Sequence, residues 1–152
     1  MPNSRDFELF VDGLSLPNFR GREFTPYWSR VRSGVRNGVP PESLWNNIVP
    51  TLVVLQKLRT ELGVWITLTS TYRRPAYNRA IAGAGASFHM DFKAIDFSCA
   101  TGSPSDWARS LKGYRGQAFD LPGIHGDYIF RGGVGIYDTF VHIDTRGWDA
   151  NW

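Results

Sequence analysis

The sequence lacks several features that would assign it to a broad class. Its 152 residues include one cysteine, which excludes an internal disulfide and a zinc site built from cysteines. No run of Lys and Arg forms a nucleic-acid-binding arm, and no aromatic and basic signature of an RNA-recognition domain is present. No stretch approaches the roughly 18 apolar residues of a membrane span. We therefore expect no nucleic-acid partner and no membrane span, and any metal must be held by His, Asp or Glu.

An ordinary secretion signal is also missing, because the first residues, MPNSRDFELF, contain no basic region followed by an apolar core. We therefore expect synthesis in the cytoplasm, so another route must deliver the protein if it acts outside. The 17 basic and 14 acidic residues leave a net charge of +3, which favours weak attraction to anionic polymers such as those of bacterial walls. The length suits a single domain over residues 1–152, which we expect to be monomeric.

The chain divides into an irregular first part and a more regular remainder. Residues 1–40 are punctuated by proline and glycine and rich in aromatic side chains, so we expect an irregular segment that wraps the core. Apolar residues then recur at spacings of three and four up to Leu62, which predicts a helix that ends at Gly63. This helix either kinks at Pro50 or restarts there with Asn47 as its cap.

The motif-bearing core, residues 41–152, alternates helices with short strands. Strands are predicted over 64–69, 92–98, 134–137 and 140–145. Short helices are predicted over 76–81 and from Ser103 or Ser105 to about Lys112, and residues 113–130 are expected to form a loop. This order lacks the spacing of parallel βαβ units and predicts an α+β fold. We expect a small, mainly antiparallel sheet flanked by helices, with the functional site on one sheet face.

Two of the three histidines lie in unusual surroundings. Side chains alternate along a strand, so Asp96 points to one face of strand 92–98 while its apolar neighbours point to the other. A carboxylate there is costly unless it is paired or bound to a metal. His142 also lies between apolar residues of a predicted strand, and His89 lies just before strand 92–98.

A sheet that joins these two strand faces would gather His89, Asp96 and His142 around one point. Two imidazoles and one carboxylate, with one open position, are a usual ligand set of catalytic zinc. The same residues also allow a buried His–Asp hydrogen-bond network without metal, in an unrelated α+β protein. Both alternatives follow from the residues alone.

Two longer strings carry a family resemblance. The first, STYRRPAYNRAIAGAGASFHMDFKAIDF (70–97), matches S-x-Y-R-x-P-x-Y-N followed by S-x-H-x-x-G-x-A-x-D. The second, GGVGIYDTFVHIDTRGW (132–148), is similar to a closing G-x-G-x-Y-x-x-F-V-H-x-D segment. The chain thus resembles the zinc D-alanyl-D-alanine carboxypeptidase family, of the lysostaphin, D-alanyl-D-alanine peptidase and hedgehog-like group, from about residue 42 to its last residue. The matching residues are Ser70, Tyr72, Arg73, Pro75, Tyr77, Asn78, Ser87, His89, Ala94 and Asp96, followed by the closing segment.

This resemblance implies a zinc ion on His89, Asp96 and His142 that polarises the substrate carbonyl and acidifies a bound water. Arg73 matches the family arginine that binds a substrate carboxylate or the oxyanion, whereas its neighbour Arg74 has no such role. Without the motif, Arg73 would be read as part of a surface salt bridge.

The sequence departs from the family pattern at two positions. Phe92 replaces the usual glycine between the first two ligands, and Thr139 occupies the position where many members carry an acidic general base. The base must therefore be sought elsewhere. Asp144 lies about 6–7 Å along the strand from His142 on the same face, whereas Asp138 would lie about 13 Å away. We rank Asp144 above Asp138 as base, with the alternative that Asp144 only orients His142.

Tyr72, Ser87 and His125 are further candidates for substrate binding. Ser87 has no nucleophile-elbow context and is interpreted as a hydrogen-bonding loop residue. Tyr72 also suits a scaffold role around Arg73, and His125 equally suits an exposed loop. The resemblance implies cleavage of bacterial peptidoglycan stem peptides, as a D,D-carboxypeptidase or an endopeptidase, and the missing signal suggests a phage lysin, virion-associated lysin or delivered effector acting at the cell wall or periplasm. The alternative is a non-catalytic wall-binding or virion structural module of the same fold.

Overall fold

The computed structural model describes residues 3–123 and 126–152, so His125 lies outside the described residues. The N-terminal part is more regular than its prolines and glycines indicate. It contains two α-helices, α1 (Ser4–Asp12) and α2 (Thr25–Trp28), with a short 3-10 helix, η1 (Gly21–Glu23), between them. A hairpin of β1 (Val31–Arg32) and β2 (Val35–Arg36) follows. Asn3 caps α1 by accepting a hydrogen bond from the Asp6 amide, and Phe7 and Val11 on one helix face are fully buried. Tertiary burial of this face stabilises a helix where the sequence analysis expected irregular chain.

The long central helix starts at Val49, one residue before Pro50, so the proline does not interrupt it. A 3-10 segment, η2 (Glu42–Ile48), leads into α3 (Val49–Leu62), and Pro50 occupies the first turn, where its missing N–H costs nothing. Asn47 is not the cap, because its side-chain amide donates to the Asp91 carbonyl at 2.9 Å. Gly63 ends the helix in the left-handed conformation, with φ of 66°.

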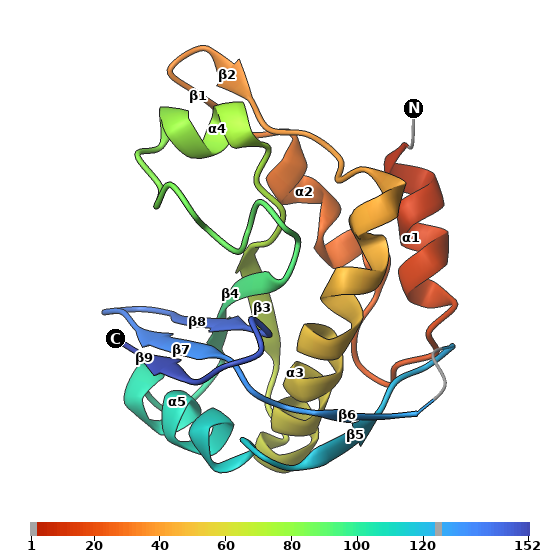
Figure 1. Ribbon diagram of the computed structural model, residues 1–152, viewed down its shortest axis with the longest axis vertical. Helices are drawn as coiled ribbons and strands as arrows, with labels where there is room; N and C mark the ends of the chain where they lie inside the picture. Colours follow the sequence, from red (N-terminus) through yellow and green to blue (C-terminus); the bar gives the residue numbers. More distant parts are fainter. Residues whose placement is uncertain (1–2, 124–125) are drawn as a thin grey trace.

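Five strands form the main sheet, in the order β3-β4-β8-β7-β9 (Figure 1). They are β3 (Ile66–Ser70), β4 (Ala94–Cys99), β7 (Gly133–Ile136), β8 (Val141–Asp144) and β9 (Ala150–Asn151). All neighbouring pairs are antiparallel except β7 with β9, which is parallel. The predicted α+β fold with a small, mainly antiparallel sheet is therefore confirmed.

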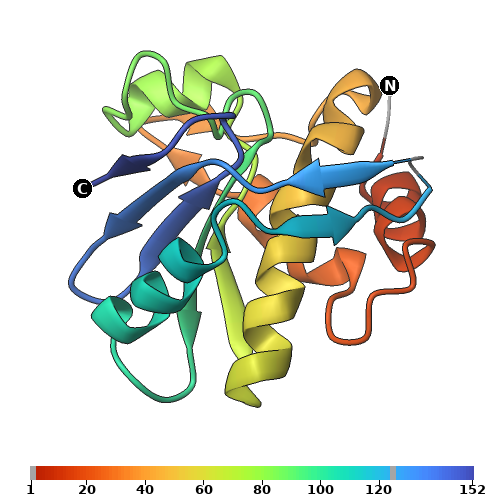
Figure 2. The same cartoon turned by 60° about the horizontal axis from the view of Figure 1, so that its bottom comes forward.

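The remaining elements surround this sheet. They are α4 (Pro75–Ala80), α5 (Pro104–Gly113) and a hairpin of β5 (Ala118–Asp120) and β6 (Asp127–Ile129), which crosses over α3 (Figures 1 and 2). Ser103 caps α5. The expectation of a loop over 113–130 is wrong, because the buried Phe119 ties a short hairpin to the core. No helix of the described residues is long and apolar enough to cross a bilayer.

The two faces of the main sheet have opposite character. Phe97 on β4 lies against Trp107 of α5, with ring centroids 6.3 Å apart, so this face belongs to the core. Asp96 points the other way, as does its cross-strand partner His142 on β8. The fold thus presents polar side chains on the sheet face that is not covered by α5.

Candidate metal centre

Strand pairing brings together two residues that are 46 positions apart in the sequence. Asp96 and His142 are direct partners in the antiparallel register of β4 and β8. Such partners have close Cβ atoms on the same sheet face. The neighbouring β3 carries a register shift between Leu68 and Ser70, and the hydroxyl of Thr69 donates to the Asp96 carbonyl at 3.1 Å. A bulge beside a functional site re-aims local side chains.

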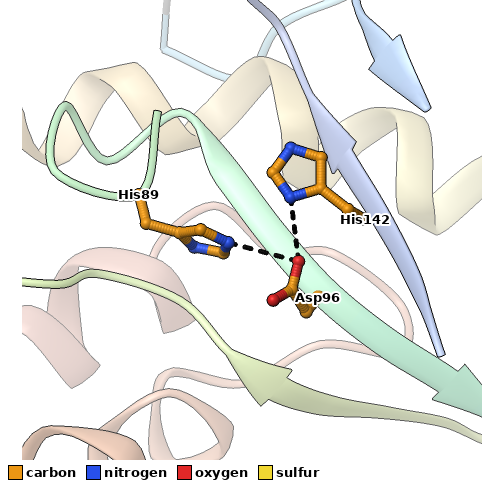
Figure 3. Close-up of side chains that lie close together, drawn as sticks. All are labelled: His89, Asp96 and His142. Atoms are coloured by element: carbon orange, nitrogen blue, oxygen red, sulfur yellow. Dashed lines mark hydrogen bonds and ion pairs between the residues drawn. The ribbon is translucent and has the colours of Figure 1, made fainter. Parts of the chain in front are cut away.

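His89 completes the cluster from the loop before β4 (Figure 3). One carboxylate oxygen of Asp96, Oδ1, lies 3.2 Å from His89 Nε2 and 2.9 Å from His142 Nδ1. One possible ligand atom of each residue lies within 4.8 Å of the others, and all three side chains are buried. The sequence prediction that these residues gather on the sheet face is confirmed.

The outer nitrogen of each imidazole has its own partner. His89 Nδ1 lies 2.6 Å from the carbonyl oxygen of Thr71, and His142 Nε2 lies 2.7 Å from Asp144 Oδ2. If these nitrogens carry the protons, both inner nitrogens offer lone pairs toward the same point as the Asp96 carboxylate. Metal-binding histidines have this arrangement, with the second nitrogen donating to a carbonyl or carboxylate. The donor set therefore fits a divalent metal of the zinc type.

The pKa shifts of the cluster, in the protein without a metal ion, differ between the two histidines. Hydrogen bonds with Asp144 and Asp96 outweigh burial and raise the pKa of His142. Burial lowers the pKa of His89 and so favours its neutral form. Burial raises the pKa of Asp96, but interactions with His89 and His142, when these imidazoles carry protons on the nitrogens that face the carboxylate, outweigh burial and hold the pKa well below its usual range. The Asp96 carboxylate is therefore ionised at neutral pH.

Asp144 is fully buried and surrounded by donors. It accepts hydrogen bonds from His142, from the amide of Gly133 at 3.0 Å, and from Nε and Nη2 of Arg146 at 2.9 and 2.7 Å. These interactions outweigh burial and hold the pKa of Asp144 well below its usual range. Of the two roles predicted for Asp144, this geometry suits the orienting one, because its oxygens are already occupied. Asp138 lies exposed in the turn between β7 and β8.

A cleft of about 770 Å³ opens above the cluster. Arg73 lines it, with Nη2 3.4 Å from Asp96 Oδ2 and Nε donating to the Tyr27 hydroxyl at 3.3 Å. Ser87 also lines it, and its hydroxyl accepts from the His89 amide at 3.3 Å. Tyr72 does not line it, because its ring is buried against Phe92. The other lining residues include aromatic side chains and the glycine-rich loop: Ala82, Gly83, Ala84, Ala86, Phe88, His89, Asp96, Tyr137, Phe140, His142, Arg146, Trp148 and Trp152.

A model of the peptidase M15 family matches residues 17–144. The chain belongs to the peptidase M15 family. Membership supports a metallopeptidase, in agreement with the buried His–Asp–His cluster at the floor of the cleft. No significant match was found among curated proteins or among solved structures.

The unusual Phe92 of this M15 chain keeps the backbone conformation that glycine would adopt. Its φ is 53°, in the left-handed region, and its ring is fully buried. The ring packs among aromatic side chains of the N-terminal segment, including Phe7, Phe24 and Trp28. Burial offsets the backbone strain of about 1–2 kcal/mol. The loop that joins His89 to Asp96 therefore follows its tight path without glycine.

Several supporting residues of this M15 site escaped the sequence analysis. The side chain of Asn37 donates to the Tyr72 carbonyl and accepts from the Arg74 amide, both at 2.9 Å, so it holds the backbone on either side of Arg73. Trp28 donates to the Thr71 hydroxyl at 3.1 Å. These contacts span 35 to 43 residues, and no local pattern announces them. Arg146 could have been found from the sequence, because this charged residue closely follows His142 and Asp144.

Proposed function

We propose that the protein is a zinc-dependent peptidase that hydrolyses peptide bonds in bacterial peptidoglycan, in stem peptides or their cross-links. One observation carries this proposal: His89, Asp96 and His142 meet at the floor of a cleft, with both outer imidazole nitrogens held by partners. Family membership supports the peptidase chemistry, and the resemblance in the two motif strings supports the peptidoglycan substrate.

His89, Asp96 and His142 would hold the ion, which when bound supplies Lewis-acid polarisation of the substrate carbonyl and a water of lowered pKa. Thr71 and Asp144 keep the protons on the outer nitrogens and so fix both ring orientations. Arg73 presents a guanidinium to the cleft, where it binds a substrate carboxylate or stabilises the oxyanion.

The general base does not occupy its usual position in the sequence, because Thr139 stands there in place of an acidic residue. Among the described residues that line the main cleft, Asp96 is the only carboxylate. We assign Asp144 to orienting His142 and leave Asp138, exposed in the β7–β8 turn, as the acid to test as base. An Asp144→Ala protein that keeps its metal but loses all turnover would restore Asp144 as the base.

We propose that the protein acts at the bacterial cell wall or periplasm, as a phage lysin, a virion-associated lysin or a delivered effector. The net charge of +3, which favours attraction to anionic wall polymers, supports this location. The scarcity of carboxylates in the cleft favours one second candidate, a wall-binding or virion structural module that binds zinc without cutting.

Digestion of purified peptidoglycan, followed by mass analysis of the fragments, separates the two candidates and identifies the bond. We expect new peptide termini with zinc-loaded protein and none after chelation. His89→Ala, Asp96→Ala and His142→Ala should each lose both cleavage and the metal, about one ion per chain in the unaltered protein. Asp91→Ala, in the same loop but exposed, is the matched control and should keep both.

Intact peptidoglycan after treatment with protein that demonstrably carries zinc would refute the enzymatic proposal and favour the binding module. Full metal retention in all three ligand variants would refute the assignment of the metal centre.

A further inference from the structure

The cleft is one of three neighbouring cavities, which we together call the trough. A second cavity of about 430 Å³ shares Arg73, Asp96 and Phe140 with the main cleft. A third cavity of about 520 Å³ shares Tyr27 and Arg30 with the second. Because neighbouring cavities share lining residues, the three lie next to one another from the metal centre toward the β1–β2 hairpin, which lies beside α4 (Figure 1).

The far end of this trough is a pocket with two arginines, which we call the arginine pocket. Its lining residues are Tyr27, Arg30, Val31, Arg32, Tyr77 and Ile81. Both arginines are exposed, and the Arg30 guanidinium carbon lies 4.9 Å from the centre of the Tyr27 ring. Within residues 3–123 and 126–152, no carboxylate lies within salt-bridge distance of either arginine. The pocket thus offers guanidinium groups that no internal acid neutralises.

Tyr27 connects the arginine pocket to the reaction site. Its hydroxyl accepts a hydrogen bond from Nε of Arg73, and its ring packs edge-on against Tyr77, with centroids 6.0 Å apart. Arg73 is already engaged on two sides, by Tyr27 and by Asp96. The guanidinium is thus held at the boundary between the main cleft and the second cavity, both of which Arg73 lines.

The opposite end of the trough is aromatic. Trp148, Trp152 and Tyr137 line the main cleft and remain 59%, 46% and 42% exposed. The Arg146 guanidinium lies 5.8 Å from the Trp148 ring centre and 5.1 Å from that of Trp152. The metal centre therefore has binding surface on both sides, one side aromatic and the other cationic.

From this arrangement we propose that the arginine pocket binds a carboxylate of the substrate beyond the scissile bond, so that the chain is cut internally. A carboxylate is the group that planar guanidinium donors recognise best in a peptide. This inference rests on the proposed peptidase function and deepens it, because it selects endopeptidase over carboxypeptidase action. Arg30 and Arg32 become specificity-determining residues at a distance from the metal.

The test compares a cross-linked muropeptide dimer with the same dimer after amidation of its carboxyl groups. Binding is measured by calorimetry on zinc-loaded protein, and cleavage by mass analysis. Arg30→Gln with Arg32→Gln should weaken binding of the native dimer about fivefold and leave binding of the amidated dimer unchanged. The dimer should be cut faster than a monomeric stem peptide with a free C-terminal carboxylate. Arg5→Gln with Arg109→Gln, on α1 and α5, removes the same charge at positions 71% and 78% exposed and should change neither.

The outcomes distinguish failure of the arginine pocket from failure of the peptidase function on which it rests. The Arg30 and Arg32 substitutions could weaken binding of the native and the amidated dimer equally, or the control pair could weaken binding of the native dimer as much. Either result would show that only the net charge of the protein matters and would overturn the carboxylate pocket. Faster cleavage of the monomer would overturn the internal cut. A protein that binds the native dimer through these arginines but cuts nothing would keep the pocket and refute the peptidase function. A protein that binds neither ligand would overturn both.

Discussion

Replacing Asp144 by Asn tests whether this carboxylate holds the metal site together. The buried carboxylate accepts hydrogen bonds from His142 at 2.7 Å and from two nitrogens of Arg146 at 2.9 and 2.7 Å. The Asn side chain has the same shape but only one acceptor oxygen. Its NH2 group would face one of the N–H donors, and the Arg146 guanidinium would lose its negative partner. Breaking a buried pair in this way costs about 3 kcal/mol.

This cost can be measured in two ways. For a chain of this length, a loss of about 3 kcal/mol lowers the melting temperature by roughly 6–12 °C. Loss of the partner that orients His142 should also weaken zinc affinity about 10- to 100-fold, measured by competition with a chelator. Asp138→Asn removes the same charge from an exposed turn and should change neither stability nor zinc affinity.

Acid provides an internal check on the stability change. Because the folded protein holds the pKa of Asp144 below its ordinary value of 3.8, the ionised carboxylate stabilises the folded state above that pH. The contribution is lost as the pH falls below 3.8 toward the folded-state pKa. The stability difference between the metal-free protein and its Asp144→Asn variant should shrink over this range. Unchanged stability and zinc affinity at neutral pH would refute the orienting role.

The remaining predictions concern the cleft arginine and the left-handed phenylalanine. Arg73→Ala should lower peptidoglycan cleavage far more than Arg74→Ala, because only Arg73 lines the main cleft; equal losses would contradict its substrate role. Phe92→Ala should cost about 3–5 kcal/mol in the free energy of unfolding by urea. Phe92→Gly should be about 1 kcal/mol more stable than Phe92→Ala, because glycine adopts φ of 53° without strain. The reverse order would show that the loop relaxes out of the left-handed region.

The metal cluster could be predicted because its signal is local. Period-two alternation placed Asp96 and His142 on strand faces, and isolated polar residues between apolar neighbours marked them as unusual. Pairing of β4 with β8 then brings the face that carries Asp96 beside the face that carries His142. His89 lies in a loop, where residue periodicity predicts nothing about the path of the chain. It was assigned to the cluster from the motif strings.

The supporting contacts could not be predicted, because they join distant segments. Asn37 and Trp28 act on residues 71–74 through single hydrogen bonds, which leave no periodic pattern in either segment. The hairpin of β5 and β6 was missed because strands of three residues are too short for alternation to stand out. Helix α1 was missed although Asn3, Asp6 and the apolar residues Phe7 and Val11 together form a helix-start signal.

Phe92 makes the metal site and the N-terminal helices thermodynamically interdependent. The residue lies between the proposed ligands His89 and Asp96, and its ring contacts Phe7 of α1 and Trp28 of α2. Any ordering of the ligand loop by metal must therefore also favour docking of these helices, and linkage makes the effect reciprocal. Metal binding should slow amide hydrogen exchange in α1, which contributes no ligand. A relative with glycine at this position would lack that ring, so its ligand loop and its N-terminal segment could vary independently.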